Sequence, residues 1–209
     1  MNNTILNNDA SLRERLKQRR DAQTHQDMSR GSLLIRGRLF TWLATNQARL
    51  ERTGLPRVNH IAAFWSLPGE PSLEPLLRQW VEEEGYSVSL PVVTQTDAPL
   101  QFRLWVPDAP MRDGSYGIQE PTGALAPLPD VMLVPALGFT REGDRIGYGK
   151  GYYDRTLADL RERNHPFTSL AIAWATGDLS DENYTPAEHD QKLDGILTDK
   201  GWPMPAPEI

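Results

Sequence analysis

Short apolar runs alternate with stretches of helical periodicity along most of this chain. Residues 60–66 form a short apolar run typical of a buried strand, and residues 73–81 then repeat apolar side chains at helical spacing. Further apolar runs follow at residues 131–136 and 169–175, with a predicted helix between them. Strands that alternate with helices are typical of α/β proteins, so the sequence predicts this class with a mainly parallel sheet.

The other elements follow from the same patterns. Ser11 is expected to cap the first helix, with Glu14 completing a capping box. Residues 107–129 hold many Pro and Gly and are expected to form a long loop. The remaining predicted helices are 11–22, 32–50 and 152–163, and the remaining strands are 86–93, 100–106 and 196–198.

Length and composition predict one folded domain. The chain has 209 residues, of which 39% are hydrophobic and 24% charged, as in ordinary globular proteins. The Asn-rich start and the proline-rich end break this pattern. We therefore expect a disordered tail over residues 1–10, a single domain over residues 11–200 and an irregular tail over residues 201–209.

Charge and cysteine content exclude several classes of protein. The formal net charge of −6 gives no global attraction for nucleic acid, and the lack of cysteine excludes disulfides and thiolate metal sites. No apolar stretch reaches the roughly 18 residues of a membrane span, and the N-terminus does not resemble a secretory signal. The expectation is a cytoplasmic monomer without nucleic-acid or membrane partners.

A glycine-rich segment lies between the predicted strand 131–136 and the predicted helix 152–163. Such a place attracts phosphate, because backbone N–H groups are unsatisfied there and the helix dipole is positive. Arg145 and Lys150 add positive charge, and Asp154, in the first helical turn, could hold a Mg²⁺ that bridges phosphate oxygens. The segment therefore predicts a phosphate site. Its glycines are Gly143, Gly147, Gly149 and Gly151.

This loop differs from the two common phosphate-binding signatures. Lys150 is followed by Gly151 and not by Ser or Thr, so it is not a Walker loop. Its G-x-G-x-G spacing is not a dinucleotide fingerprint either. The alternative is a flexible turn with a solvated Lys150 and an Asp154 that only complements the helix dipole.

Five basic residues lie within eight positions near the start of the chain. Such a run is typical either of an arm that binds nucleic acid or of a solvated helix face. We favour the solvated face, because the chain as a whole is acidic. The four histidines show no metal-ligand spacing. The basic residues are Arg13, Arg15, Lys17, Arg19 and Arg20.

The segment GDRIGYGKGYYDRTL, residues 143–157, closely resembles the signature of the 5-formyltetrahydrofolate cyclo-ligase family, also called methenyltetrahydrofolate synthetases. Further segments resemble the family in the expected order, so the resemblance covers roughly residues 11–200. It implies a three-layer α/β/α sandwich. These segments are SLRERLKQRR at 11–20, IAAFWSLPGEPSLEPLL at 61–77, LPVV at 90–93, FRLW at 102–105, YGIQEPTG at 116–123 and EHDQKLDGILTD at 188–199.

The resemblance also implies a reaction. Enzymes of this family join the formyl carbon on N5 of tetrahydrofolate to N10, which gives 5,10-methenyltetrahydrofolate as ATP is broken down to ADP and phosphate. The chain is thus expected to be an enzyme that binds 5-formyltetrahydrofolate and MgATP. Two alternatives stay open: a catalytically silent family member that binds nucleotide or folate, and another phosphate-handling α/β enzyme such as a sugar-phosphate isomerase.

Site residues are implied by position in the family motifs. Lys150 and Arg145 would be catalytic, with Lys150 nearest the transferred phosphoryl group. Family members often have a Lys four residues before the position of Arg13, where this chain has Asp9. The implied ATP-binding residues are Arg13, Arg145, Gly147, Gly149, Lys150, Gly151 and Tyr153; the implied folate-site residues are Trp65, Glu70, Tyr148 and Tyr152; and the implied Mg²⁺ ligands are Asp154 and Asp190.

Overall fold

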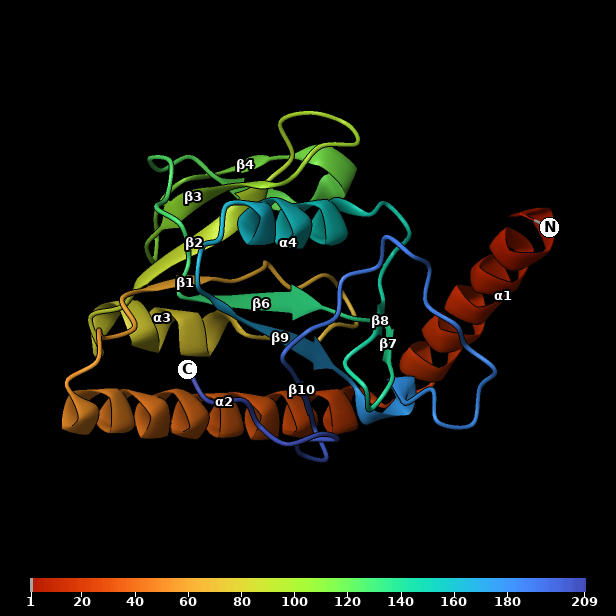
Figure 1. The fold of residues 1–209 in the computed structure, drawn as a ribbon, viewed down its shortest axis with the longest axis horizontal. Coiled ribbons are helices and arrows are strands. Elements are labelled where there is room, and N and C mark those ends of the chain that lie inside the picture. The colour runs from red at the N-terminus through yellow and green to blue at the C-terminus, as the bar shows by residue number, and fades with distance from the viewer. Residues whose placement is uncertain (1) are drawn as a thin grey trace.

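A six-stranded sheet forms the centre of the protein, as a computed structural model shows (Figure 1). The structure describes residues 2–209, with side chains from residue 10 onward. Neighbouring strands pair in parallel except β2 and β3, which pair antiparallel. In sheet order the strands are β10 (Gly195–Thr198), β9 (Thr168–Ala173), β6 (Val131–Pro135), β1 (His60–Ala62), β2 (Ser87–Val92) and β3 (Gln101–Trp105).

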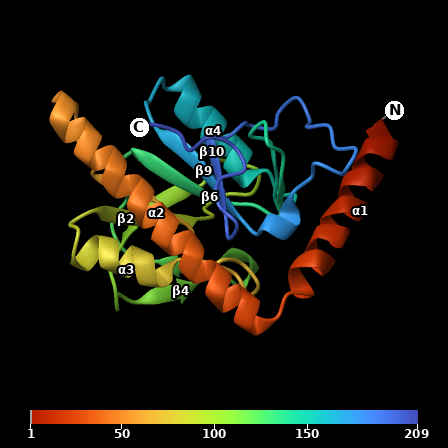
Figure 2. The ribbon, with the colours of Figure 1, turned by 90° about the horizontal axis from the view of Figure 1, so that it is seen from below.

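Helices cover both faces of this sheet. The chain passes from β1 to β2 through α3 (Glu74–Glu82) and from β6 to β9 through α4 (Tyr152–Glu162), in opposite directions across the sheet. Because such crossovers are right-handed, opposite directions place the two helices on opposite faces. Helix α2 (His25–Thr53) lies on the face of α3, as Figures 1 and 2 show. The three-layer α/β/α sandwich is confirmed.

Each face of the sheet has its own hydrophobic core. On one face, α2 and α3 bury side chains such as Leu39 and Trp80 against the sheet. On the other, α4 buries Leu157 and Leu160 against Met132 of β6. Strands buried on both faces explain the continuous apolar runs at residues 131–136 and 169–175 in the sequence.

Helix α1 (Asn2–Asp21) begins earlier than the expected residue 11. The capping role expected of Ser11 is wrong, because Ser11 lies inside the helix, where its hydroxyl accepts a hydrogen bond from Arg15 at 3.0 Å. No Gly or Pro stands before Ser11 to end the helix there. Of the expected disordered tail, Met1 lies outside the described residues.

Helix α2 also begins earlier than expected, at His25 instead of residue 32. The Thr24 hydroxyl caps it by accepting a hydrogen bond from the Asp27 N–H at 3.1 Å. Gly31 lies inside the helix. The position requires glycine, because a Cβ there would come within 2.6 Å of the Trp174 ring. Close packing thus explains a glycine that looks like a helix boundary in the sequence.

Two hairpins interrupt segments that were expected to be loops. The segment 107–129 contains β4 (Met111–Asp113) and β5 (Gln119–Pro121), which pair antiparallel around a short 3₁₀ turn, η1 (Ser115–Gly117). The glycine-rich segment contains β8 (Arg145–Ile146), which pairs with β7 (Gly138–Phe139). Both hairpins lie close to the cavity described below.

The last residues of the chain pack against α2 and β10, where Pro207 lies beside Gly195. The Trp42 indole N–H donates to the Pro207 carbonyl at 2.8 Å, and the Trp42 and Trp202 rings lie 6.1 Å apart. Within residues 2–209, no helix combines the length and apolar character that crossing a bilayer requires. The division into one domain and two tails stays a prediction, as does the cytoplasmic location.

Leu39 and Leu33 offer a matched test of the α2 packing. Leu39 is fully buried and Leu33 is 61% exposed on the same helix. We expect Leu39→Ala to lower the free energy of unfolding by about 2–5 kcal/mol, because it leaves a cavity in the core. Leu33→Ala should change it by less than about 0.5 kcal/mol. Urea denaturation measures both; equal effects would contradict the orientation of α2.

Candidate active site

A cavity of about 370 Å³ opens at the carboxyl ends of three neighbouring strands. Trp65 follows β1, Val93 follows β2 and Pro135 ends β6, and all three line the cavity. The chain leaves β1 toward one side of the sheet and β6 toward the other, so the strand order reverses between them. Open α/β sheets bind ligands in the crevice at such a reversal.

Every site residue expected from the sequence lines this one cavity. They come from α1, from the segment after β1, from the glycine-rich loop with the start of α4, and from the loop before β10. Segments far apart in the sequence are thus brought together. These residues are Arg13, Trp65, Glu70, Arg145, Gly147, Tyr148, Gly149, Lys150, Gly151, Tyr152, Tyr153, Asp154 and Asp190.

Two glycines give the loop its path. Gly149 and Gly151 have left-handed backbones, with φ of 86° and 66°, which only glycine adopts without strain. Gly151 stands at the N-terminus of α4, and no side chain caps that end. The uncapped first turn therefore offers N–H groups and a positive dipole beside the cavity.

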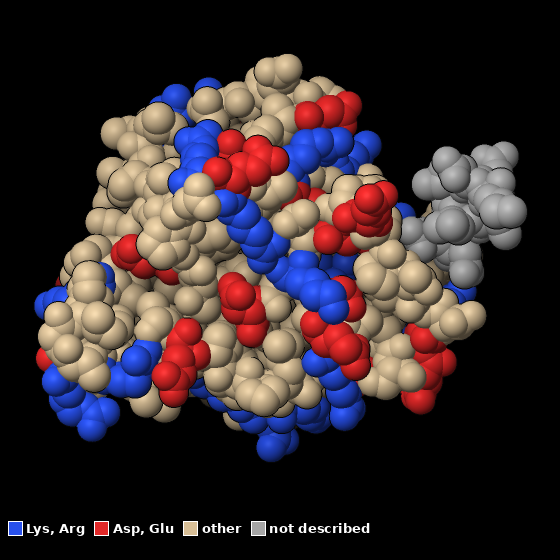
Figure 3. Space-filling view, viewed as in Figure 1, with Lys and Arg blue, Asp and Glu red and all other residues tan. Residues whose placement is uncertain are grey.

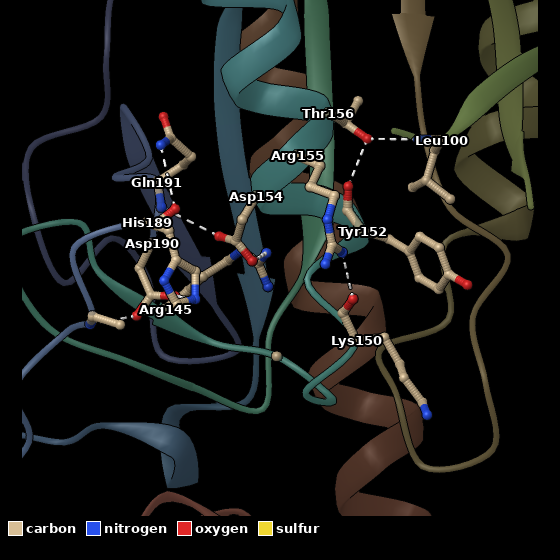
Figure 4. A network of polar contacts seen from close by, with 12 residues as sticks. Leu100, Arg145, Lys150, Tyr152, Asp154, Arg155, Thr156, His189, Asp190 and Gln191 are labelled. Atoms are coloured by element: carbon tan, nitrogen blue, oxygen red, sulfur yellow. Dashed lines mark hydrogen bonds and ion pairs between the residues drawn. The ribbon is translucent and has the colours of Figure 1, made fainter. Parts of the chain in front are cut away.

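Arg145 and Asp154 form a buried ion pair across the loop (Figure 4). Their side chains are 6% and 15% exposed, and Nη2 of Arg145 lies 2.9 Å from Oδ2 of Asp154. The Gln191 N–H donates to the other carboxylate oxygen at 3.2 Å, and the Arg145 guanidinium lies 5.6 Å from the centre of the Tyr153 ring. Among the described residues no group accepts a hydrogen bond from the buried Nε of Arg145. Arg145 is thus held firmly but keeps one free donor.

Lys150 has a different environment. Its ammonium lies 5.5 Å from the centre of the Tyr116 ring, and no carboxylate among the side chains of residues 10–209 pairs with it. Its main-chain carbonyl accepts a hydrogen bond from Arg155 at 2.8 Å, as Figure 4 shows. The backbone of Lys150 is therefore fixed while its charge stays available to an anion.

Glu70 and Tyr148 meet on the opposite side of the cavity. The Tyr148 hydroxyl donates to Oε1 of Glu70 at 2.6 Å, and the Leu67 N–H donates to Oε2 at 2.8 Å. Burial raises the pKa of Glu70, and these two hydrogen bonds oppose that rise. Burial, followed by the neighbouring Glu70, raises the pKa of Tyr148, so its hydroxyl stays protonated and remains a donor.

Asp154 and Asp190 are the two carboxylates that could hold a metal. Oδ2 of Asp190 accepts hydrogen bonds from the Ala187 N–H at 2.8 Å and the Tyr184 hydroxyl at 3.3 Å, while its Oδ1 has only the exposed His189 at 3.9 Å. No group of three or more metal-ligating side chains occurs in the described part of the chain. Two carboxylates fit a Mg²⁺ that takes its other ligands from phosphate and water.

Sequence reasoning missed several residues of the cavity. Tyr116 reaches it from η1, and its hydroxyl lies 3.2 Å from that of Tyr152. The buried Glu120 of β5 accepts a hydrogen bond from the Val93 N–H at 3.0 Å. Both belong to the segment 116–123, whose resemblance to the family is the signal that could have identified them.

The basic side chains of α1 mostly have partners within the chain. Arg15 and Arg19 both pair with Glu182, and Arg20 pairs with Asp21 at 2.8 Å. Arg13 donates to the Gly147 carbonyl at 3.2 Å. On the face seen in Figure 3, basic and acidic side chains lie interspersed. The Arg13 contact ties α1 to the cavity, and the other pairs leave few of its charges free for nucleic acid. The side chain of Asp9 lies outside the described ones.

The fold and the site define an α/β protein with a glycine-rich, cation-bearing loop at the reversal of its strand order. Its sequence matches the model of the 5-formyltetrahydrofolate cyclo-ligase family over residues 5–199. It is 34% identical to the 5-formyltetrahydrofolate cyclo-ligase of Haemophilus influenzae over 149 residues, which are 68% of this chain and 76% of that protein. It is 35% identical to that of Mycolicibacterium smegmatis over 151 residues, 67% of this chain and 73% of that protein.

The fold agrees with this match. The solved structure of Aquifex aeolicus 5,10-methenyltetrahydrofolate synthetase superposes with a TM-score of 0.70 at 23% identity, covering 93% of this chain and 91% of that one. The chain therefore belongs to the 5-formyltetrahydrofolate cyclo-ligase family, a family of enzymes. The resemblance read from the sequence is confirmed, and a sugar-phosphate isomerase is not favoured.

Burial of Glu70 predicts a change of stability with pH. Because its pKa is raised above the usual 4.5 in the folded protein, folding favours the protonated form, and stability is lost as pH rises from 4.5 through the folded pKa. Glu70→Gln stays neutral and escapes this loss. We expect the free energy of unfolding of the wild type, relative to the variant, to fall over this range in urea titrations. A constant or rising difference would contradict the burial effect.

Proposed function

We propose that this chain converts 5-formyltetrahydrofolate into 5,10-methenyltetrahydrofolate while ATP is broken down to ADP and phosphate. One observation supports this most directly: a single cavity joins a phosphate-type loop on one side to an aromatic and carboxylate surface on the other. Membership of the family supports the reaction, and the two different sides of the cavity support one binding side for each substrate.

The glycine-rich loop would hold the ATP phosphates. The uncapped start of α4 supplies N–H groups, and Lys150 supplies a cation with no carboxylate partner among the described residues. The free Nε of Arg145 is a further donor for a phosphate oxygen. Arg13 lies against the same loop through the Gly147 carbonyl, and Tyr153 packs beneath Arg145. We assign the catalytic roles to Lys150 and Arg145.

Asp154 and Asp190 would hold a Mg²⁺ at the edge of this phosphate site. Both carboxylates line the cavity, and Oδ1 of Asp190 has no close donor in the described chain. When bound, the ion neutralises charge on phosphate oxygens. Asp154 would keep its ion pair with Arg145, which uses its Oδ2 oxygen.

The folate would occupy the other side of the cavity. Glu70 is suited to accept hydrogen bonds from N–H groups of the pterin ring, since two donors already fix its orientation. Trp65 lies next to Trp105, with ring centres 6.1 Å apart, and forms a wall. Tyr148 and Tyr152, from the glycine-rich loop, face the same substrate and adjoin the phosphate side.

This arrangement suits a reaction in two steps. The formyl oxygen attacks the terminal phosphorus of ATP, which transfers the phosphoryl group to that oxygen and releases ADP. N10 then attacks the activated carbon and loses its proton, the carbon–oxygen bond breaks, and phosphate departs. Phosphoryl transfer depends on positioning and charge neutralisation more than on covalent help from the protein. We also propose that the protein acts as a monomer in the cytoplasm, without nucleic-acid or membrane partners.

Lys150→Ala should remove the activity and keep the fold. The variant loses a cation at the transferred group, which is expected to lower kcat by about 100-fold or more. The assay mixes pure protein, 5-formyltetrahydrofolate and MgATP and follows methenyl absorbance. Lys200→Ala is the control, because Lys200 is 81% exposed and lies outside the cavity lining. Unchanged turnover of Lys150→Ala would remove Lys150 from the mechanism.

Asp190→Asn should weaken the response to magnesium. We expect the Mg²⁺ concentration that gives half-maximal ATP binding to rise about tenfold, because one carboxylate ligand becomes a neutral amide. ATP-dependent thermal stabilisation, measured over a series of Mg²⁺ concentrations, reports this shift without turnover. Asp181→Asn, at an exposed carboxylate outside the cavity lining, should change nothing. Identical Mg²⁺ curves for wild type and Asp190→Asn would exclude Asp190 as a ligand.

A further inference from the structure

Arg20, near the end of α1, touches the residues that form the folate side of the cavity without lining the cavity itself. Its Nη1 donates to the Tyr148 hydroxyl at 3.3 Å, and that hydroxyl donates to Glu70 at 2.6 Å. The three side chains therefore form a hydrogen-bonded chain from α1 to the Glu70 carboxylate. The family-like segment 11–20 ends at Arg20, but the resemblance implies no role for it, and Arg20 does not line the cavity.

The position of Arg20 is fixed from several sides. Its side chain is 16% exposed, and its Nε donates to Asp21 at 2.8 Å, which leaves Nη1 for Tyr148. Gly69 has a left-handed backbone, and a Cβ there would lie 3.0 Å from Nε of Arg20. The guanidinium thus rests on the main chain directly before Glu70. A larger residue at position 69 would crowd the guanidinium and would also strain this left-handed backbone.

The segment that carries Glu70 is rigid as well. The Trp174 indole N–H donates to the Gly69 carbonyl at 2.7 Å, and the Glu70 N–H donates to the Leu67 carbonyl at 2.9 Å. Burial raises the pKa of Glu70, while Tyr148, the Leu67 N–H and Arg20 lower it. A cation at this place thus favours the charged carboxylate that hydrogen-bonds N–H groups.

One face of α1 connects Arg20 to the nucleotide side. Arg13, Leu16 and Arg20 are spaced three and four residues apart, so they share a face of the helix. Leu16 is buried against Ile146, which lines the cavity. Arg13 and Arg20 are separated by about 10 Å along the axis. Helix α1 therefore contacts the loop with one arginine and the folate side with the other.

We propose that Arg20 is a positioning residue for the folate substrate, acting through the Tyr148 hydroxyl to hold Glu70 in its binding orientation. This rests on the proposed function, because it takes Glu70 and Tyr148 as folate contacts. Arg20 itself touches no substrate. Arg13, which lies on the same face of α1 nearer its N-terminus, contacts the nucleotide side instead.

The direct test is the dissociation constant for 5-formyltetrahydrofolate without ATP, followed by tryptophan fluorescence. Arg20→Ala should raise it about tenfold, as expected for losing a hydrogen bond between a charged group and a buried one. The KM for ATP should change by less than about twofold. Arg20→Lys keeps a cation in place and should recover most of the affinity. Arg19→Ala, which removes the neighbouring pair with Glu182, should leave folate affinity unchanged.

A double-mutant cycle with Tyr148→Phe separates positioning from general support of α1. If Arg20 acts through the Tyr148 hydroxyl, adding Arg20→Ala to Tyr148→Phe should cost less than about twofold more. Fully additive losses, or equal losses for Arg19→Ala and Arg20→Ala, would overturn the proposal. Wild-type turnover to methenyl product separates failure of the proposed function from failure of this inference alone. Its absence would contradict the proposed function and this inference with it, whereas normal turnover with unchanged folate affinity in Arg20→Ala would contradict this inference only.

Discussion

The ion pair between Arg145 and Asp154 holds the loop on which the site depends. It joins the first residue of β8 to the first turn of α4, so the glycine-rich path between them is closed at both ends. Both side chains are largely buried, and removing one partner of such a pair costs about 3–5 kcal/mol because the other charge is left uncompensated. The flexible glycines thus work inside a rigid frame. The alternative suggested by the sequence, a flexible turn, would lack the ion pair that fixes both ends of the loop.

Topology explains why this frame faces a cavity that has two sides. The strand order reverses between β1 and β6, so the segments after these strands diverge and leave a crevice. The segment after β1 brings Trp65 and Glu70, and the segment after β6 leads to the glycine-rich loop. Tyr148, which belongs to that loop, crosses to Glu70. Two substrates that must react with each other can therefore meet at one place.

Much of this could be predicted from the sequence, because the signals are local. Glycine spacing, the following helix and the buried strand before it lie within one short segment, and the α/β pattern follows from periodicity. Other features depend on contacts between distant segments. Tyr116 adopts a left-handed backbone with φ of 62°, which no composition rule reveals for a tyrosine. Arg20 and Tyr148 stand 128 positions apart, and Tyr148 and Glu70 stand 78 apart. Only the fold brings such pairs together.

A crystal structure with Mg²⁺, a non-hydrolysable ATP analogue and 5-formyltetrahydrofolate tests the central claim most directly. We expect the terminal phosphate to lie against the N–H groups at the start of α4 and the Lys150 ammonium, with the pterin ring at Glu70 and the formyl group between them. A terminal phosphate bound elsewhere, with the loop at residues 145–151 turned away from it, would contradict the account.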